Sequence, residues 1–377
     1  MNALILGTND RSVILKNLIE NVYIKYKDSP LKISAFVDIE NEKRSIISGK
    51  PIVSQKSMID WYHAGEVQKI IMPRDNLIGY TSILQILMVN GIKLEDFLIS
   101  QQIDWNLFED DRLDNLLEPY CDAKFLPYLE FHIADHCNLN CKACSHYSGL
   151  VTKPRFPNFN QWARDFDLLK TFIDDIGVIR ILGGEPLLNP EILLYMLKAR
   201  ENYPLARIYI VTNGIRLMSM PEVFFEACRN LDIEIQVSLY LPMQSQASRL
   251  DKFLSTFGVK YGISDTVGFF EMKQILEPND NPVRAFLQCD EGRCNNFYDG
   301  KIAACFFPFT TKYFNEYFGK NLPEDGAIDL HEPNLTTEIL KTRLLTPFER
   351  CRYCTSAKLA PWAQIKNPST LDDWIRE

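Results

Sequence analysis

The sequence lacks cysteine in its first 120 residues, although the whole chain of 377 residues contains ten. It also lacks any run of about 18 apolar residues, so we expect no membrane-spanning helix. The first residues lack the basic segment and cleavage site of a signal peptide, which favours a cytoplasmic protein. Lysine and arginine total 41 against 49 for aspartate and glutamate. An acidic chain of this kind gives no sign of a nucleic-acid or anionic-membrane partner.

The ten cysteines fall mostly into three tight groups. In a cytoplasmic chain, clustered cysteines are more typical of metal binding or catalysis than of disulfides. Two isolated cysteines, Cys121 and Cys228, are predicted to be small buried core residues. The groups are Cys137, Cys141 and Cys144 in a C-x3-C-x2-C run, then Cys289, Cys294 and Cys305, and finally Cys351 and Cys354.

Residues 1–104 read as alternating strands and helices. Short apolar strands are predicted at residues 3–6, 32–37 and 67–72, and helices at 13–26 and 80–90. Such alternation is typical of a doubly wound α/β domain with a parallel sheet. Residues 105–127 follow as a connector with helical character, which includes the acidic stretch 109–111.

The first strand-to-helix turn of this domain begins at Gly7 and carries one glycine where a dinucleotide-binding fingerprint has three. Fewer positions without a Cβ keep the backbone further from a pyrophosphate. With segments 36–38 and 49–53, the domain resembles the Rossmann-like domains attached to sugar-modifying and glycan-assembly enzymes. Nucleotide binding and a docking or substrate-presenting role both stay open.

From residue 128 the strand–helix rhythm resumes. Strands are predicted at 128–133, 178–182, 208–212 and 234–239, and helices at 160–175, 190–202, 222–230 and 245–257. Repeated βα units favour a partial (βα)6 TIM-type barrel over residues 128–270, with chemistry at the carboxyl ends of its strands. Residues 271–377 are irregular, proline-rich and aromatic, and are predicted to form a small cysteine-rich C-terminal domain.

Polar or glycine-rich residues follow successive strands of this predicted barrel. The cysteine run follows the first strand, and Gly183-Gly184-Glu185, Thr212-Asn213-Gly214 and Ser238 follow the next three. Structural zinc usually takes four ligands, whereas three thiolates on a [4Fe–4S] cluster leave one iron open. From the cysteine run alone, iron–sulfur and zinc both remain open.

Together these residues resemble the radical S-adenosylmethionine (radical SAM) superfamily over residues 128–270. The resemblance implies that Cys137, Cys141 and Cys144 hold a [4Fe–4S] cluster. It also implies that Gly183, Gly184 and Glu185 contact the amino group of S-adenosylmethionine, with Asn213 and Ser238 as further cofactor contacts. Many members have an aromatic residue before the third cysteine, where this chain has Ala143.

The implied reaction is reductive cleavage of S-adenosylmethionine to a 5′-deoxyadenosyl radical, which abstracts hydrogen from a substrate. A flavodoxin- or ferredoxin-type protein would supply the electron. In the strand 128–133, alternation places Leu129, Phe131 and Ile133 toward the helices and turns Glu130 and His132 into the barrel. We hypothesise that Glu130 and His132 contact substrate or transfer protons; the alternative is that they satisfy each other in a polar interior.

The remaining cysteines resemble the auxiliary-cluster modules called twitch and SPASM. That resemblance implies a second [4Fe–4S] cluster on Cys289, Cys305, Cys351 and Cys354, with Cys294 as a replacement for Cys289. A zinc site with four cysteines is the alternative. If Cys294 is not a ligand, it is a candidate hydrogen donor for an epimerase.

The leading functional hypothesis is a radical SAM enzyme that oxidises or epimerises a small molecule, with a nucleotide sugar or glycan precursor as the expected class. A radical SAM peptide maturase is a second hypothesis. A zinc-stabilised binding protein without enzyme activity is the third. The substrate class rests on analogy through the N-terminal domain alone.

Overall fold

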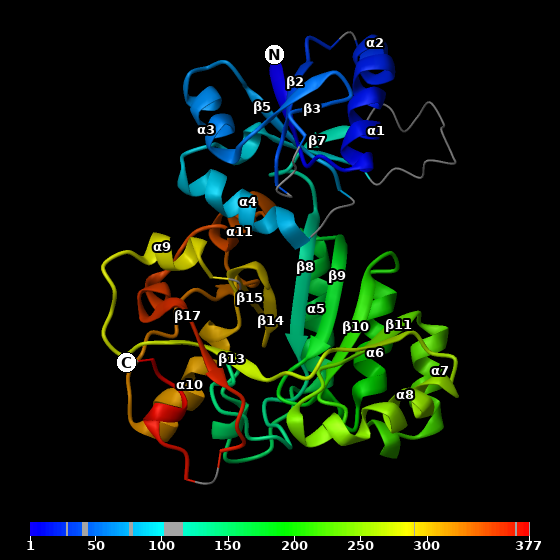
Figure 1. Cartoon of the computed structure of the whole chain (residues 1–377), viewed down its shortest axis with the longest axis vertical. Helices are drawn as coiled ribbons and strands as arrows, with labels where there is room; N and C mark the ends of the chain where they lie inside the picture. Colours follow the sequence, from blue (N-terminus) through cyan, green and yellow to red (C-terminus); the bar gives the residue numbers. More distant parts are fainter. Residues whose placement is uncertain are drawn as a thin grey trace. The chain divides into compact units, whose positions relative to one another are not determined.

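The computed structural model describes residues 1–27, 29–39, 44–74, 78–101, 116–289, 291–365 and 368–376 (Figure 1). The chain forms two compact units. The first comprises residues 1–125 and 336–346, and the second comprises residues 126–335 and 347–377. Both are mixed α/β structures that contain parallel strands, as the sequence predicts.

A seven-stranded sheet forms the centre of the first unit, in the order β3-β4-β2-β1-β5-β6-β7. The five strands from β4 to β6 pair in parallel, whereas β3 and β7 pair antiparallel at the two edges. The strands are β1 (Asn2–Leu6), β2 (Lys32–Val37), β3 (Ile46–Ile47), β4 (Lys50–Val53), β5 (Lys69–Met72), β6 (Phe97–Ser100) and β7 (Leu117–Pro119).

Helices cover both faces of this sheet because its strands are apolar on both sides. In β1, Ala3 and Ile5 pack with α1 (Asp10–Leu18), while Leu4 and Leu6 pack with α3 (Gln55–His63) and α4 (Ile78–Val89). This is the pattern of a parallel sheet buried on both faces. The predicted helix 13–26 is interrupted, since α1 passes through a π-helical turn (Ile19–Tyr23) before α2 (Ile24–Lys27).

The boundaries of the first unit differ from the sequence prediction. Most of the expected connector, including its acidic stretch 109–111, lies outside the described residues, but residues 117–119 form the edge strand β7 rather than a helix. Residues 336–346, expected in the C-terminal domain, belong to this first unit and carry α11 (Thr337–Leu344). The Lys341 ammonium there is buried and donates to the carbonyl oxygens of Tyr120 and Ala123.

An eight-stranded sheet forms the centre of the second unit, in the order β12-β11-β10-β9-β8-β14-β15-β16. The pairs β9–β10, β10–β11, β11–β12 and β8–β14 are parallel, and β15 pairs antiparallel with β14 and β16. The strands are β8 (Phe125–His132), β9 (Asp175–Leu182), β10 (Arg207–Thr212), β11 (Ile233–Val237), β12 (Tyr261–Ile263), β14 (Asn296–Tyr298), β15 (Lys301–Ala303) and β16 (Ile328–Asp329).

The predicted boundary at residue 270 therefore does not separate two independent sheets. β14 lies in the segment expected to form a separate domain, yet Asn296 pairs with Glu130 of β8. A three-residue strand carries too little periodicity to be recognised, and its partner lies more than 160 residues earlier. A further antiparallel pair joins β13 (Phe269–Gln274) and β17 (Cys354–Pro361).

Helices pack against the outer side of the barrel-like sheet. Phe131 of β8 contacts Trp162 and Phe166 of α5 with ring centres 4.9 and 5.5 Å apart, so the predicted outward face of this strand is apolar and buried. The helices of the second unit are α5 (Phe159–Phe172), α6 (Ile192–Asn202), α7 (Glu222–Asn230), α8 (Ala247–Ser255), α9 (Pro282–Leu287) and α10 (Phe307–Phe318). The predicted helix 160–175 is shorter because β9 already begins at Asp175.

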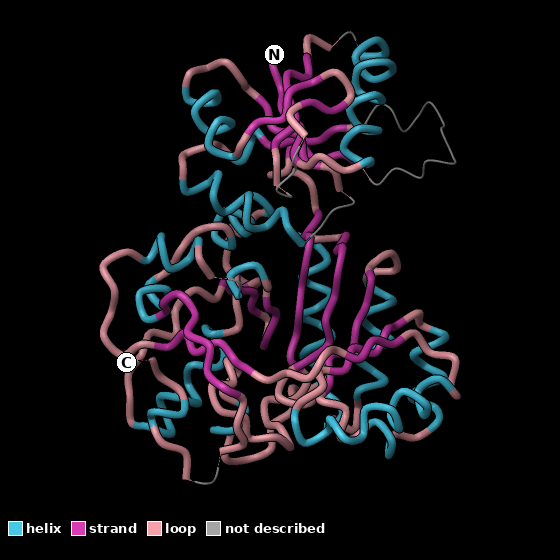
Figure 2. The backbone as a smooth tube through the Cα atoms, viewed as in Figure 1, coloured by secondary structure: helices cyan, strands magenta, loops and turns pink. Residues whose placement is uncertain are grey.

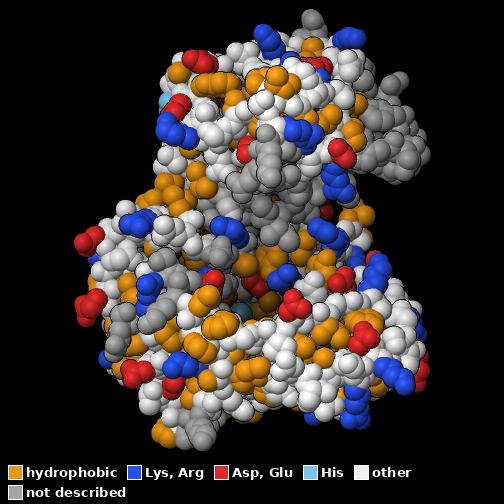
Figure 3. Space-filling model, in the orientation of Figure 1, with side chains coloured by type: hydrophobic (Ala, Val, Ile, Leu, Met, Phe, Trp, Pro, Cys, Tyr) orange, Lys and Arg blue, Asp and Glu red, His pale blue; other side chains and the backbone are white. Residues whose placement is uncertain are grey.

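The loops that follow β8 to β11 gather at one end of the sheet (Figure 2). None of the helices in the described part of the chain is long and apolar enough to cross a lipid bilayer. On the face shown in Figure 3, lysine and arginine side chains are interspersed with aspartate and glutamate among the residues drawn in colour.

Candidate active site

The cysteine loop and the ends of three neighbouring strands line one cavity of about 160 Å³. The loop follows β8, and the other walls follow β9, β10 and β11, so residues spread over a hundred positions meet at one edge of the sheet. The predicted site residues that line this cavity are Cys137, Cys141, Cys144, Gly183, Gly184, Asn213 and Ser238. Tyr240, Phe270 and His146 also line it.

The two glycines after β9 allow the backbone to lie directly against the cysteine loop. Gly184 N–H donates to the Ala134 carbonyl at 2.6 Å. A Cβ on Gly183 would come within 2.1 Å of the Ala134 carbonyl oxygen, and one on Gly184 within 2.1 Å of the His136 oxygen. Gly183 also has a φ of 147°. Only glycine fits both constraints, so these residues set the wall of the cavity.

Glu185 follows the two glycines and joins two neighbouring turns. Its side chain is fully buried and does not line the cavity. The carboxylate accepts from Leu187 N–H at 3.1 Å, from Thr212 Oγ1 at 2.6 Å and from Asn213 N–H at 2.9 Å. Burial raises its pKa to about 7, although these three donors act to lower it. Glu185 thus anchors the turn after β10 to the turn after β9.

Asn213, held in this way, reaches the first cysteine. Its Nδ2 donates to Asn138 Oδ1 at 2.7 Å and lies 3.6 Å from Cys137 Sγ. Burial raises the pKa of the Cys137 thiol above its usual range and that of Cys141 to about 12. Without a nearby cation these thiols stay protonated at neutral pH, whereas a bound metal stabilises the thiolate form.

Residues from the C-terminal segment complete the cysteine loop. Lys142 N–H donates to the Ala363 carbonyl at 2.9 Å, and Ile365 N–H donates to the Asn140 carbonyl at 2.7 Å. Ala143 has a positive φ of 57° and packs against β13 and β17. The sequence did not reveal Tyr240 and Phe270, whose rings lie 5.7 Å apart at the cavity. Their only sequence signal is that they are aromatic residues close to strand ends.

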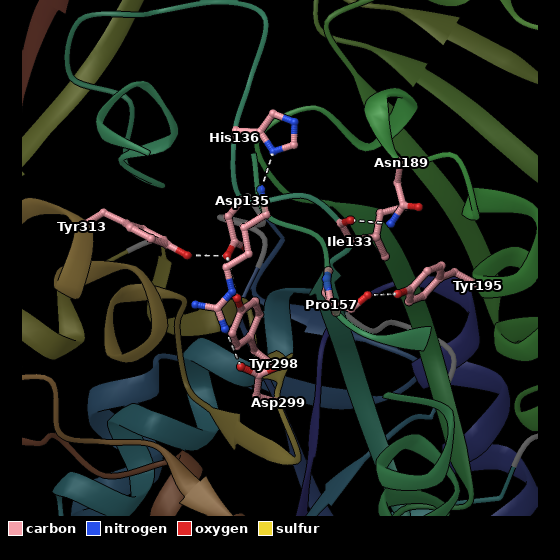
Figure 4. A network of polar contacts seen from close by, with 10 residues as sticks. Ile133, Asp135, His136, Pro157, Asn189, Tyr195, Tyr298, Asp299 and Tyr313 are labelled. Carbon is pink, nitrogen blue, oxygen red and sulfur yellow. Dashed lines mark hydrogen bonds and ion pairs between the residues drawn. The ribbon is translucent and has the colours of Figure 1, made fainter. Parts of the chain in front are cut away.

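A buried carboxylate fixes the start of the cysteine loop from the opposite side (Figure 4). Asp135 accepts from Tyr298 Oη at 2.6 Å and from the Tyr313 hydroxyl, and Arg155 Nε lies 3.5 Å from it. The backbone N–H of Arg155 also donates to His136 Nδ1 at 3.2 Å. The loop is therefore held to β14 and α10 before the first cysteine is reached.

The inner face of β8 is polar, and both hypothesised catalytic residues are buried there. The His132 ring lies 4.8 Å from that of His146, which lines the cavity. Burial lowers the pKa of His132 to about 3 and that of His146 well below its usual value, so both imidazoles are neutral at pH 7. Glu130 lies on the same face of β8 as His132, because alternate residues of a strand point to the same side.

Several buried polar atoms near this face have no hydrogen-bond partner among the described residues. Such atoms are costly in a protein interior and usually have a ligand or water. Their side chains come from β8, β9, β14 and the cysteine loop. They are His132 Nε2, His146 Nε2, Arg180 Nε, and both polar atoms of the Asn296 amide.

A second cavity, of about 20 Å³, is lined by four of the five C-terminal cysteines: Cys289, Cys305, Cys351 and Cys354. Burial, and next the neighbouring thiols of Cys289, Cys351 and Cys354, raise the pKa of Cys305. Cys294 does not line this cavity. It lies beside Tyr128 of β8, whose pKa is raised by burial and then by Glu130 and Cys294.

The donor sets of both cavities fit iron–sulfur clusters. Three thiols line the first and four line the second, and each cysteine of such a cluster binds a different iron. In the described part of the chain, no group of three or more His, Cys, Asp or Glu side chains is arranged to hold one metal ion.

Comparison with known proteins identifies the class of this domain. Residues 131–255 match the Radical SAM superfamily, which is a class of enzymes. The chain therefore carries a radical SAM domain, and this part of the sequence prediction is confirmed. The family implies a [4Fe–4S] cluster and S-adenosylmethionine as cofactors.

Particular relatives are similar to part of the chain. The GTP 3′,8-cyclase of Desulforamulus reducens is 33% identical over 97 residues, which are 25% of this chain and 29% of the relative. The molybdenum cofactor biosynthesis protein 1 of Bos taurus is 31% identical over 91 residues, or 24% of this chain and 14% of that protein. The matched region thus spans less than a third of either relative. A solved structure, BtrN in complex with AdoMet and 2-DOIA, covers 62% of this chain and 92% of its own, with 14% identity and a TM-score of 0.37.

Proposed function

We propose that this protein is a radical SAM enzyme that acts on a small polar molecule. The observation that carries the proposal is the single cavity at the strand ends, which brings Cys137, Cys141 and Cys144 together with Gly183, Asn213 and Ser238. These residues come from four successive strand–loop segments of the matched domain.

In this proposal Cys137, Cys141 and Cys144 hold a [4Fe–4S] cluster, and S-adenosylmethionine occupies the rest of the cavity. When bound, the two cofactors supply a 5′-deoxyadenosyl radical that abstracts hydrogen from the substrate. Gly183 and Gly184 keep side chains out of the space for the methionine moiety. Many members of the family have an aromatic residue at the position of Ala143. In this chain Tyr240 and Phe270 would offer the aromatic surface for the adenine instead.

The substrate site in this proposal is the polar inner face of the barrel. Neutral His132 and His146 each provide one donor and one acceptor, and Asn296 adds an amide with both polar atoms unpartnered. Arg180 adds a single positive group, whose guanidinium lies 5.6 Å from the Tyr128 ring centre. This set suits a small molecule with several hydroxyl or amide groups. Glu130 and His132 remain our candidates for substrate contact or proton transfer.

The second cavity is proposed to hold an auxiliary [4Fe–4S] cluster on Cys289, Cys305, Cys351 and Cys354, in a twitch- or SPASM-type arrangement. Such a cluster would accept an electron and make net oxidation possible. The position of Cys294 favours the other outcome, epimerisation. Because it lies beside Tyr128 and not in the four-cysteine cavity, it is proposed as a hydrogen donor to a substrate radical.

The parallel order β4-β2-β1-β5-β6 supports a Rossmann-like assignment for the first unit. We propose that this unit binds or presents the substrate, with a nucleotide sugar or glycan precursor as its class. A flavodoxin- or ferredoxin-type protein is proposed as electron donor, and neither nucleic acid nor membrane is proposed as a partner.

Anaerobic reconstitution with iron and sulfide tests this function against a zinc-stabilised binding protein. Two clusters require about eight irons per chain and a reducible signal, whereas the zinc alternative predicts about two zinc ions and no such signal. Replacement of Cys137, Cys141 and Cys144 by alanine should remove about four irons and abolish 5′-deoxyadenosine formation. Cys228→Ala is the control, since that thiol is buried in the core and should not change the iron content.

Turnover with deuterated candidates then separates the substrate classes. A sugar derivative that passes deuterium into 5′-deoxyadenosine would support the small-molecule function, and a peptide that does so would favour a maturase. A wild-type protein that holds two clusters but never yields 5′-deoxyadenosine would contradict both.

A further inference from the structure

The wall of the four-cysteine cavity includes an arginine, Arg350, beside the thiols. Arg350 is fully buried, with none of its surface exposed. Its Nη1 donates to Cys354 Sγ at 3.4 Å, its Nε donates to Thr311 Oγ1 at 3.1 Å, and its Nη2 donates to Gln274 Oε1. Its Cζ also lies 4.5 Å from the centre of the Phe307 ring. The side chain is thus fixed on every side.

All side-chain partners of this guanidinium among the described residues are neutral. The nearby Asp325 carboxylate accepts the backbone N–H of Arg350 at 2.9 Å and not its guanidinium. An arginine cannot lose its proton in a protein, and a buried charge without a counter-charge strongly destabilises the fold. The acidic groups around the guanidinium are the thiols of Cys354, Cys305 and Cys351 and the Tyr147 hydroxyl, all of which favour its charged form.

Two neighbours hold the arginine toward these thiols. Gln274 is buried in β13, and its Oε1 accepts both from Arg350 and from the Tyr147 hydroxyl, the latter at 2.9 Å. Tyr147 follows Cys144 by three residues and its N–H donates to the Cys144 carbonyl at 3.0 Å. One buried hydrogen-bonded chain therefore runs from the loop of the first cysteine site to the arginine of the second.

We infer that Arg350 is a positioning residue of the four-cysteine site: it supplies the counter-charge to thiolates there and raises the reduction potential of a cluster bound by them. The inference rests on the proposed auxiliary cluster and deepens it. Net charge and hydrogen bonds to the sulfurs are two of the means by which proteins set such potentials. A fixed cation stabilises the more negative, reduced state, since the surrounding protein screens charges weakly.

The test is potentiometry of the second cluster alone, followed by electron paramagnetic resonance. The background is the full chain with Cys137, Cys141 and Cys144 replaced by alanine, in which only the four-cysteine site holds iron. Arg350→Met should make reduction at least tenfold less favourable, which is a shift of 59 mV or more to lower potential. Arg350→Lys keeps the positive charge, so its reduction potential should lie much closer to that of Arg350 than to that of Arg350→Met. It loses the planar guanidinium that donates to both Cys354 Sγ and Gln274 Oε1.

A second variant decides the matter if Arg350→Met does not fold or does not hold iron. Gln274→Glu leaves the arginine in place and puts a carboxylate against it, so it should also lower the potential. The control is Arg352→Met, because that arginine is partly exposed and already paired with Glu349 at 3.0 Å; its shift should be well below that of Arg350→Met.

The possible outcomes separate the inference from the function on which it rests. If the background protein binds no reducible second cluster, the auxiliary cluster itself is wrong. If it binds one, and Arg350→Met and Gln274→Glu keep both its iron content and its potential, the role given to Arg350 is overturned. An equal fall in the reduction potential of the cluster in Arg350→Met and Arg352→Met would also overturn it, because any nearby positive charge would then have the same effect.

Discussion

Replacement of Glu185 by alanine removes the carboxylate that joins the turns after β9 and β10. Two backbone N–H groups, of Leu187 and Asn213, and the Thr212 hydroxyl would lose their acceptor in a fully buried place. A buried donor left without a partner costs about 1–3 kcal/mol. Because the threonine hydroxyl can rotate to another acceptor, the two N–H groups dominate, and we expect a loss of about 3–5 kcal/mol.

The loss should appear both in stability and in cofactor binding. For a unit of this size, 3–5 kcal/mol corresponds to a decrease in melting temperature of roughly 6–20 °C. Asn213 loses its anchor at the same time, and a weakening of about 1.4 kcal/mol would reduce affinity for S-adenosylmethionine about tenfold. Calorimetry of anaerobic protein measures the first quantity, and titration with S-adenosylmethionine measures the second.

A matched glutamate controls for the change in charge. Glu226 is exposed on α7 and has no side-chain hydrogen bond or ion pair within the described part of the chain, so Glu226→Ala should change stability by less than about 0.5 kcal/mol. A melting temperature of Glu185→Ala within 2 °C of the wild type, with unchanged affinity, would refute the anchoring role. Loss of affinity without loss of stability would instead mean that Glu185 contacts the cofactor directly.

Three further predictions concern other parts of the chain. Gly184→Ala should destabilise the second unit by more than about 2 kcal/mol and weaken S-adenosylmethionine binding at least tenfold, because the new methyl group would overlap the His136 carbonyl. Gly268→Ala is the control, since a Cβ there meets nothing within 4 Å and should change neither quantity. Equal melting curves for the two variants would contradict this explanation. Asp135→Leu should cost about 2–4 kcal/mol by leaving two tyrosine hydroxyls without their acceptor, whereas Asp299→Ala, at a half-exposed ion pair, should cost less than about 1 kcal/mol in the same denaturant titration. Burial lowers the pKa of Lys341 to about 7, from 10.5 for an exposed lysine. Between these two pH values the unfolded state binds more protons than the folded state, so the free energy of unfolding should rise with pH above 7. Lys341→Met should remove this gain, which is on the order of 2 kcal/mol between pH 7 and pH 9, and an unchanged pH profile would show that the ammonium is not buried.

The parts of the site that share a strand end could be predicted from sequence. Parallel strands end at a common edge, so Cys137, Gly183, Asn213 and Ser238 could be expected to meet once each was placed after its strand. The pattern does not predict where a side chain in the turn after a strand points, into the cavity or away from it. Glu185 belongs to the same motif as Gly183 but turns away from the cavity, because three donors surround its carboxylate.

Contacts between distant short segments also escaped the sequence. β14 has three residues and joins β8 through two register pairs, which is too short for a periodic pattern. The distinction between Cys289 and Cys294 depends on a few residues around η8 (Glu291–Arg293) and not on spacing. Arg350 looked like an ordinary charged residue beside a C-x2-C pair, since only its burial and its contact with Cys354 mark it as part of a site.

The return of residues 336–346 to the first unit has a consequence for the synthesis of the protein. The chain crosses between the units at residues 125/126, 335/336 and 346/347, so the first unit is not a continuous stretch of sequence. Its core includes Leu345, and Lys341 closes the loop at Tyr120. While a ribosome is still translating the second unit, the first unit therefore lacks α11. The first unit can be completed only after more than nine-tenths of the polypeptide has been made, so its completion depends on translation of most of the second unit.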